Sequence, residues 1–139
     1  ITSMEKGDTG DVGLIDFSKL NVLVVEDNKV NQMVILAMLK SLNIAATVEG
    51  SGEEALDNLT RHQYDIILMD INLPGIDGVA TTRKIKAMNI NSYMLALTAD
   101  VYRDNQDKKL FDNFLTKPIL LDDLRDSLTL ALTKLGASK

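Results

Sequence analysis

Short apolar runs alternate along this chain with longer segments that mix apolar and polar residues. Most of the runs are rich in valine, isoleucine or leucine, which is typical of strands buried on both faces of a sheet. The runs that we expect to form strands are 21–25, 45–48, 64–69, 93–97 and 114–115. Because strands alternate with helix-like segments, the pattern predicts an α/β fold, a doubly wound parallel sheet with helices on both faces.

The mixed segments carry helix signals, and they predict helices over 29–41, 51–61, 77–88, 103–110 and 122–135. Ser51 and Glu54 have the spacing of a capping box, and Asn28 and Asp77 stand where an N-cap is expected. In the first segment the apolar residues near helical spacing are Val30, Met33, Val34, Ala37 and Met38. Methionine adapts to irregular gaps, so we expect the core to be filled in part by Met33, Met38 and Met88.

One domain accounts for most of the chain, from residue 20 to residue 135. Residues 1–19 interleave glycine with aspartate and show no apolar period, which predicts a flexible leader or linker. Residues 136–139 read as a tail. The chain begins with Ile, so we expect a processed or excised piece of a longer protein.

Composition removes several classes of function. The 139 residues include 20 acidic and 15 basic side chains, one His and no Cys. Disulfides, thiolate metal sites and multi-histidine metal sites are therefore excluded. The net charge of −5 disfavours direct binding to nucleic acid or to anionic membranes. No apolar run is long enough to span a membrane and no secretory signal opens the chain, so we expect a cytoplasmic domain.

Polar side chains stand at the carboxyl ends of four of the predicted strands, where ligands bind in sheets of this kind. These residues are Glu26, Asp27, Asp70, Thr98 and Lys117. Each taken alone has an ordinary explanation, such as a helix cap or a solvated charge. Their occurrence at successive strand ends predicts one site at one edge of the sheet.

The residue types in this predicted site suit phosphoryl chemistry. Clustered carboxylates repel one another, by about 4 kcal/mol per pair at 4 Å and an effective dielectric of 20, and a hard cation such as Mg²⁺ relieves that repulsion. Asp70 is the candidate nucleophile for an aspartyl phosphate. Lys117 and the Thr98 hydroxyl are candidates to contact two other phosphoryl oxygens.

Four sequence motifs carry a resemblance to a known family. They are Val24-Val25-Glu26-Asp27-Asn28, the run from Met69-Asp70 through Pro74 to Asp77-Gly78, Leu97-Thr98-Ala99, and Thr116-Lys117-Pro118-Ile119. From about Asn21 to Leu135 the chain resembles the receiver domain of two-component response regulators. The run from Val25 to Gln32 is more like receivers of hybrid sensor histidine kinases. The resemblance implies a five-stranded, flavodoxin-like sheet of order 2-1-3-4-5.

The resemblance also implies a role for the metal and for the acceptor. Asp70 would accept a phosphoryl group from a phosphohistidine of a histidine kinase or a histidine phosphotransfer domain. Asp27, Asp70 and the backbone carbonyl of Asn72 would bind Mg²⁺, with Glu26 acting directly or through water.

A switch is implied as well. Thr98 and Lys117 would contact the phosphoryl group, Thr98 would move inward, and Phe114 would rotate with it to change a partner-binding surface. The Lys117–Pro118 peptide bond resembles the family's cis peptide. Two features depart from the family: the stretch from Thr98 to Lys117 is about three residues short, and Phe114 stands where tyrosine is common.

Three other functions remain to be compared with this one. A phosphorylation-independent pseudo-receiver adaptor is the main alternative, because the shortened stretch lies in the usual output surface. A magnesium-dependent phosphohydrolase needs a second acid two residues after the nucleophile, where this chain has Asn72. A flavodoxin-like FMN binder conflicts with the acidic edge. We therefore expect a signalling domain rather than an enzyme, tethered to the inner membrane if its parent is a sensor kinase.

Overall fold

The computed structural model describes residues 16–99 and 108–137. Within these ranges the strands are β2 (Val22–Val25), β3 (Ala46–Glu49), β4 (Ile66–Asp70), β5 (Tyr93–Thr98) and β6 (Asn113–Thr116). The helices are α1 (Lys29–Ser41), α2 (Gly52–Leu59), α3 (Gly78–Ala87) and α5 (Leu121–Ala137). Most of the helix expected over 103–110 lies outside the described residues.

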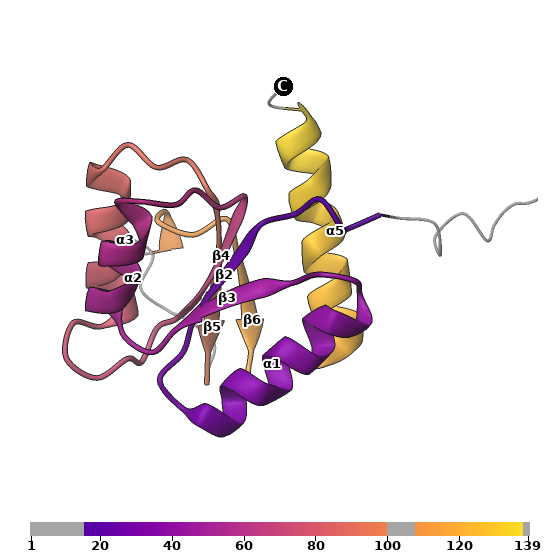
Figure 1. The fold of residues 1–139 in the computed structure, drawn as a ribbon, viewed down its shortest axis with the longest axis horizontal. Coiled ribbons are helices and arrows are strands. Elements are labelled where there is room, and N and C mark those ends of the chain that lie inside the picture. The colour runs from indigo at the N-terminus through magenta and orange to yellow at the C-terminus, as the bar shows by residue number, and fades with distance from the viewer. Residues whose placement is uncertain (1–15, 100–107, 138–139) are drawn as a thin grey trace, which may run out of the picture.

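All five strands are parallel and pair in the order β3-β2-β4-β5-β6 (Figure 1). In chain order this is 2-1-3-4-5, so the predicted fold class is confirmed. The order reverses beside β2, which places the carboxyl ends of β2 and β4 next to each other, where such sheets bind ligands.

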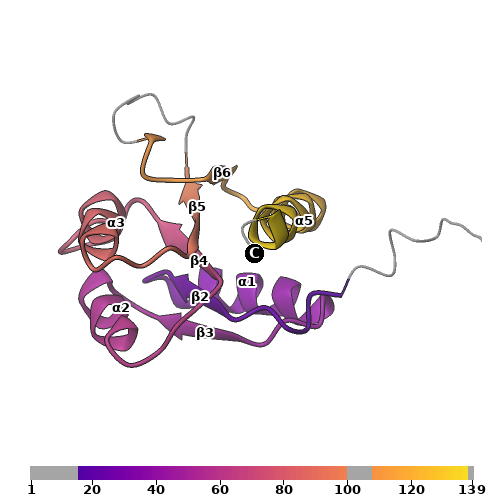
Figure 2. The same ribbon diagram turned by 90° about the horizontal axis from the view of Figure 1, so that it is seen from above.

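Helices cover both faces of the sheet, with α2 and α3 on one side and α1 and α5 on the other (Figure 2). Successive residues of a strand point to opposite faces, so each strand contributes to two cores. On β2, Val22 and Val24 pack with α1 and α5, whereas Leu23 and Val25 pack with α2 and α3. The continuous apolar runs of β2, β4 and β5 follow from burial on both faces.

The predicted helix caps are present. Asn28 Oδ1 accepts a hydrogen bond from the backbone N–H of Asn31, and Asp77 Oδ1 accepts one from Ala80. Ser51 Oγ accepts from the N–H of Glu54 at 3.1 Å. These bonds satisfy donors that the first turn of each helix leaves open, so the helix starts were readable from sequence.

The predicted packing of α1 was wrong at several positions. Val30 and Met33 are 67% and 70% exposed, and Val34 is also exposed. The buried face of α1 is made of Gln32, Ile35 and Leu39. Every residue from 33 to 39 is apolar, so the spacing of apolar residues could not indicate which face of the helix packs on the sheet. Met88 is likewise exposed at the end of α3.

The packed domain begins before residue 20. Phe17 lies in the stretch expected to be a linker, yet its side chain is only 5% exposed and belongs to the core beneath α1 and α5, together with Leu20. Asp16 Oδ1 accepts hydrogen bonds from the backbone N–H and the hydroxyl of Ser18, and these bonds span Phe17. Among the described helices, none has both the length and the hydrophobicity required to cross a bilayer.

Candidate functional site at the carboxyl edge of the sheet

The register of the sheet brings the predicted site residues to one edge. Val25 is aligned with Met69 on the neighbouring strand, and Thr98 is aligned with Thr116. Glu26 and Asp70 therefore leave the sheet at one level, and because Met69 is aligned with Ala96, Thr98 and Lys117 lie slightly further along the same edge. The side chains at this edge are those of Glu26, Asp27, Asp70, Thr98 and Lys117.

Three carboxylates form a cluster here. Glu26, Asp27 and Asp70 each offer an oxygen atom, and these atoms all lie within 4.8 Å of one another. Glu26 is 1% exposed and Asp70 is 2% exposed, whereas Asp27 faces solvent. A hard cation fits such a donor set, because it is all oxygen, carries three negative charges and is open to water on the Asp27 side.

Lys117 joins two of the three acids. Its Nζ lies 2.9 Å from Glu26 Oε1 and 3.1 Å from Asp70 Oδ2. The backbone N–H of Lys117 donates to the carbonyl of Thr98 at 2.7 Å, which ties the base of this side chain to the end of β5. The Lys117–Pro118 peptide bond is cis. The ammonium group is thereby brought over the acidic cluster from the far side of the sheet edge.

Burial and the hydrogen bond between Glu26 and Lys117 act in opposite directions on the pKa values of these two residues. Burial raises the pKa of Glu26, and the hydrogen bond from Lys117 only partly opposes this. For Lys117, burial acts to lower the pKa, but the hydrogen bond to Glu26 and the charge of Asp70 outweigh it, so its pKa lies above the ordinary value. Lys117 is therefore protonated, and burial disfavours the charged form of Glu26.

Backbone geometry fixes the position of Asp70. Its Oδ1 accepts a hydrogen bond from the N–H of Asn72 at 2.9 Å, which leaves Oδ2 for Lys117. The start of α3 approaches so closely that a Cβ on Gly78 would lie 2.2 Å from the Asp70 carbonyl oxygen. Gly75 has a φ of 71°, which suits glycine in the intervening loop. The loop from Asn72 to Gly78 thus holds the candidate acceptor in place.

Comparison with known proteins assigns the family. Residues 22–129 match the family model of the response regulator receiver domain. This chain is a receiver domain of that family. The match covers most of the chain and includes every strand from β2 to β6.

Similar proteins include hybrid kinases and separate receivers. The sensor histidine kinase RcsC of Escherichia coli is 28% identical over 132 residues, which cover 93% of this chain and 14% of that protein. The chain therefore spans only a small part of the length of such relatives. The receiver domain of the sensor histidine kinase PA1611 from Pseudomonas aeruginosa is 36% identical, with a TM-score of 0.73 over 82% of this chain and 98% of that one. In that structure a magnesium ion is coordinated in the active site cleft.

A third similar structure includes a partner. The receiver domain of the response regulator Ssk1 from Saccharomyces cerevisiae was solved in complex with the histidine phosphotransfer protein Ypd1. It is 28% identical to this receiver domain, with a TM-score of 0.74, and the match covers 81% of this chain and 88% of that one.

The other residues predicted to take part in the site lie on β5, on β6 and in the loop after β4. Thr98 is buried at the end of β5, and Asn72 is exposed beside Asp70. Phe114 lies half-buried on β6, and its ring centroid is 5.6 Å from that of Phe111 in an edge-to-face arrangement. Asp100, two positions after Thr98, lies outside the described residues.

Sequence reasoning missed Gln32. This side chain lies on the buried face of α1, and its Nε2 donates to the backbone carbonyl of Glu26 at 2.6 Å. The sequence signal was helical spacing. Gln32 comes three positions before Ile35 and seven before Leu39, so it lies on the same face of α1 as these two residues.

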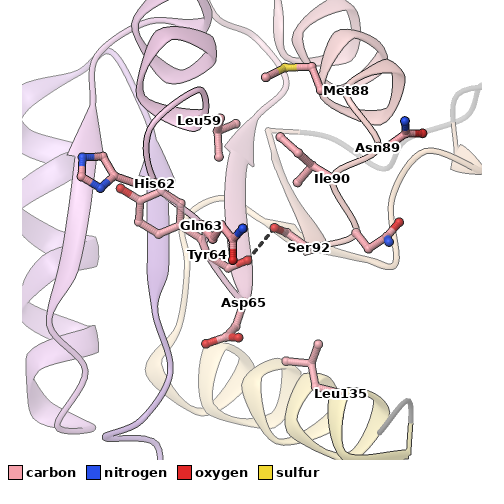
Figure 3. A pocket seen from close by; sticks show the side chains of 11 residues that line it. Leu59, His62, Gln63, Tyr64, Asp65, Met88, Asn89, Ile90, Ser92 and Leu135 are labelled. Carbon is pink, nitrogen blue, oxygen red and sulfur yellow. Dashed lines mark hydrogen bonds between the residues drawn. The ribbon is translucent and has the colours of Figure 1, made fainter.

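A cavity of about 440 Å³ lies at the opposite end of the sheet, where the strands begin (Figure 3). Apolar side chains such as Leu59 and Ile90 line it, together with amide and hydroxyl groups such as Gln63 and Ser92. The Ser92 hydroxyl is already bonded to the carbonyl of Tyr64 at 2.6 Å. This cavity is remote from the acidic cluster, so its size has no bearing on the chemistry at Asp70.

Proposed function

We propose that this receiver domain accepts a phosphoryl group on Asp70 from a phosphohistidine of a histidine kinase or a histidine phosphotransfer domain, in a magnesium-dependent reaction. The observation that carries the proposal is the surroundings of Asp70. It is a buried carboxylate with one oxygen fixed by a backbone N–H, a lysine on the other, and two further acids within 4.8 Å.

The transfer is a direct displacement at phosphorus. An Asp70 oxygen forms the new P–O bond while the bond from phosphorus to the histidine nitrogen breaks, and the released imidazole takes up a proton from water. Asp70 is positioned for this by Asn72 and by the close approach of Gly78. Such positioning matters because in-line transfer depends on alignment of the reacting atoms.

Magnesium fits the acid cluster of this chain. Glu26, Asp27 and Asp70, with the backbone carbonyl of Asn72, would hold the ion, which when bound neutralises negative charge on the phosphoryl oxygens. Lys117 supplies a second positive charge, and its raised pKa keeps it protonated. Because Lys117 is tied to Thr98 through its backbone, phosphorylation would be communicated to β5 and β6, with Thr98 and Phe114 as the switching pair.

The partner would dock over the exposed face of α1. Val30, Met33 and Val34 form this α1 surface, and a cleft leads from Val34 past Pro118 to the acidic cluster. A phosphohistidine must reach Asp70 from outside, and an exposed apolar surface beside the cleft suits a helix that carries it. The complex of Ypd1 with the similar Ssk1 receiver supports a partner of this class. Because a partner of this class would act in the cytoplasm, we propose that compartment for the domain as well.

The first test is phosphorylation by a small donor. With acetyl phosphate and Mg²⁺, we expect intact mass spectrometry to show one added phosphoryl group. The addition should vanish with EDTA and in Asp70→Asn. Asp57→Asn is the matched control, because Asp57 is an exposed acid on α2 whose carboxylate pairs with Arg61, and it should be phosphorylated like the wild type.

The same experiment separates the alternatives. Addition that persists in Asp70→Asn would overturn Asp70 as the acceptor. If neither small donors nor a panel of phosphorylated kinases and phosphotransfer proteins modify the chain, the pseudo-receiver adaptor becomes the better interpretation. A turnover of donor to inorganic phosphate that outpaces accumulation many-fold would favour a hydrolase.

A further inference from the structure

We propose that Gln32 is a positioning residue that sets the magnesium affinity of the site by holding the peptide unit between Glu26 and Asp27. This inference rests on the proposed function, because it concerns how the same acids are presented to the ion. Gln32 contacts neither Asp70 nor the phosphoryl group, so it acts through the backbone of its neighbours.

The Glu26 carbonyl needs a partner that the sheet does not supply. β2 ends at Val25. The next backbone hydrogen bond toward β3 involves the Glu26 N–H, which donates to the carbonyl of Glu49 at 3.1 Å. The Gln32 side chain supplies the missing donor at 2.6 Å. Buried backbone carbonyls are almost always paired, so this bond fixes the direction of the carbonyl.

The peptide unit held in this way carries the acid pair. Its carbonyl belongs to Glu26 and its nitrogen to Asp27, and a peptide unit is planar, so fixing one end orients the other. The Glu26 carboxylate is held on the same side by the N–H of Asn28 at 3.1 Å and by Lys117. Asp27 is exposed, and its carboxylate position depends mainly on this backbone.

Gln32 is well placed to serve as a brace. It is only 9% exposed and lies in the first turn of α1, where its own N–H donates to the Asn28 carbonyl at 2.9 Å. The bond to Glu26 therefore closes a loop between two residues six positions apart, and Asp27 lies within this loop. A loop held at both ends presents its carboxylate with less entropy to lose when an ion binds.

The test compares Gln32→Met with the wild type. Methionine has similar length and helix propensity but cannot donate to the carbonyl. Calorimetric titration of the unphosphorylated domain with MgCl₂ should show the dissociation constant rising about ten-fold, which is the size of effect typical when a residue that orients a metal ligand is lost. Gln63→Met is the matched control: it is the same substitution at an exposed position at the other end of the sheet, and affinity should stay unchanged.

A second readout distinguishes positioning from general stability. The magnesium concentration that gives half the maximal rate of phosphorylation by acetyl phosphate should rise about ten-fold in Gln32→Met, while the rate at saturating magnesium changes less than two-fold. A purely structural role would lower the melting temperature in EDTA without moving the half-saturating concentration. If Gln32→Met does not fold, Gln32→Asn takes its place, because its amide stops one methylene short of the carbonyl.

Two different failures are distinguishable. If the wild type binds magnesium and both folded Gln32 variants bind it equally well, Gln32 is not a positioning residue and the proposed function stands. If the wild type does not bind magnesium at all, the proposed function loses its metal and the inference falls with it.

Discussion

Lys117 lies between two carboxylates that repel each other. At an effective dielectric of about 20, each such pair at 4 Å costs about 4 kcal/mol, and Lys117 contacts both Glu26 and Asp70 within 3.1 Å. This single cation does not fully compensate for Glu26, whose pKa is raised by burial. The site therefore retains uncompensated negative charge, which favours binding of a divalent cation.

A pH dependence follows for Glu26. Its pKa is raised above the ordinary value of 4.5, so the folded state binds this proton more tightly than the unfolded state does. The contribution of Glu26 to stability is therefore greatest at low pH and is lost as the pH rises above about 4.5. In EDTA at pH 7 we expect Glu26→Gln to melt a few degrees above the wild type, with the difference shrinking toward pH 4.5 in a series of thermal melts.

Magnesium provides the control for this prediction. In excess Mg²⁺, ion binding stabilises the wild type more than it stabilises Glu26→Gln. The difference in melting temperature in favour of the variant should therefore shrink or reverse. A Glu26→Gln protein that melts below the wild type in EDTA at neutral pH would show that the ion pair with Lys117 outweighs burial.

At the scale of elements, α1 combines two functions on two faces. Its buried face packs Ile35 and Leu39 against the sheet and braces Glu26 through Gln32. Its opposite face exposes Val30 and Met33 to solvent beside the cleft. An exposed apolar face next to the proposed acceptor Asp70 is the arrangement expected for a transient protein partner.

We predict that Met33→Glu slows phosphotransfer from a protein donor and spares the small donor. The donor is a phosphorylated histidine phosphotransfer protein, selected from a panel by its transfer to the wild-type domain. A charge in the middle of the α1 surface should lower kcat/KM about ten-fold or more, equivalent to about 1.4 kcal/mol. The rate with acetyl phosphate should remain within two-fold of the wild type.

Met88→Glu is the matched control for this prediction. Met88 is also an exposed methionine at a helix end, but it lines the cavity at the opposite end of the sheet. Transfer to Met88→Glu should match the wild type. Equal transfer to Met33→Glu would place the docking surface elsewhere on the receiver.

At the scale of the whole molecule, the segment before β2 is part of the folded unit. Phe17 and Leu20 join the core that α1 and α5 form on one face of the sheet. The two helices that flank the site edge are thereby linked, far from the acids, by residues that precede the first strand.

We predict that Phe17→Ala lowers the free energy of unfolding by about 3 kcal/mol, the lower end for a buried phenylalanine, because a segment outside the strands and helices can relax. Urea unfolding followed by circular dichroism measures the change. Leu130→Ala is the control: this leucine on α5 is 58% exposed, and its loss should cost less than about 0.5 kcal/mol. A loss below about 1 kcal/mol for Phe17→Ala would mean that the segment is not anchored by this side chain.

Much of the fold was predictable because its signals are local. The central strands β2, β4 and β5 are apolar runs because they are buried on both faces. Asn28, Ser51 and Asp77 cap helices through bonds to residues three positions away. The site was predictable for a related reason. In a parallel sheet all carboxyl ends meet at one edge, so polar residues at those ends are neighbours once the strands are known.

The sequence alone determined the fold class, the starts of three helices and the set of acids and lysine at the site edge. Only the tertiary structure decided which face of α1 is buried, that Phe17 belongs to the core and that Gln32 reaches the Glu26 carbonyl. The two groups of features differ in how far apart in sequence the residues that determine them lie. Capping and strand patterns depend on neighbours in sequence, whereas the rotation of a helix with apolar residues all around it is set by what it packs against.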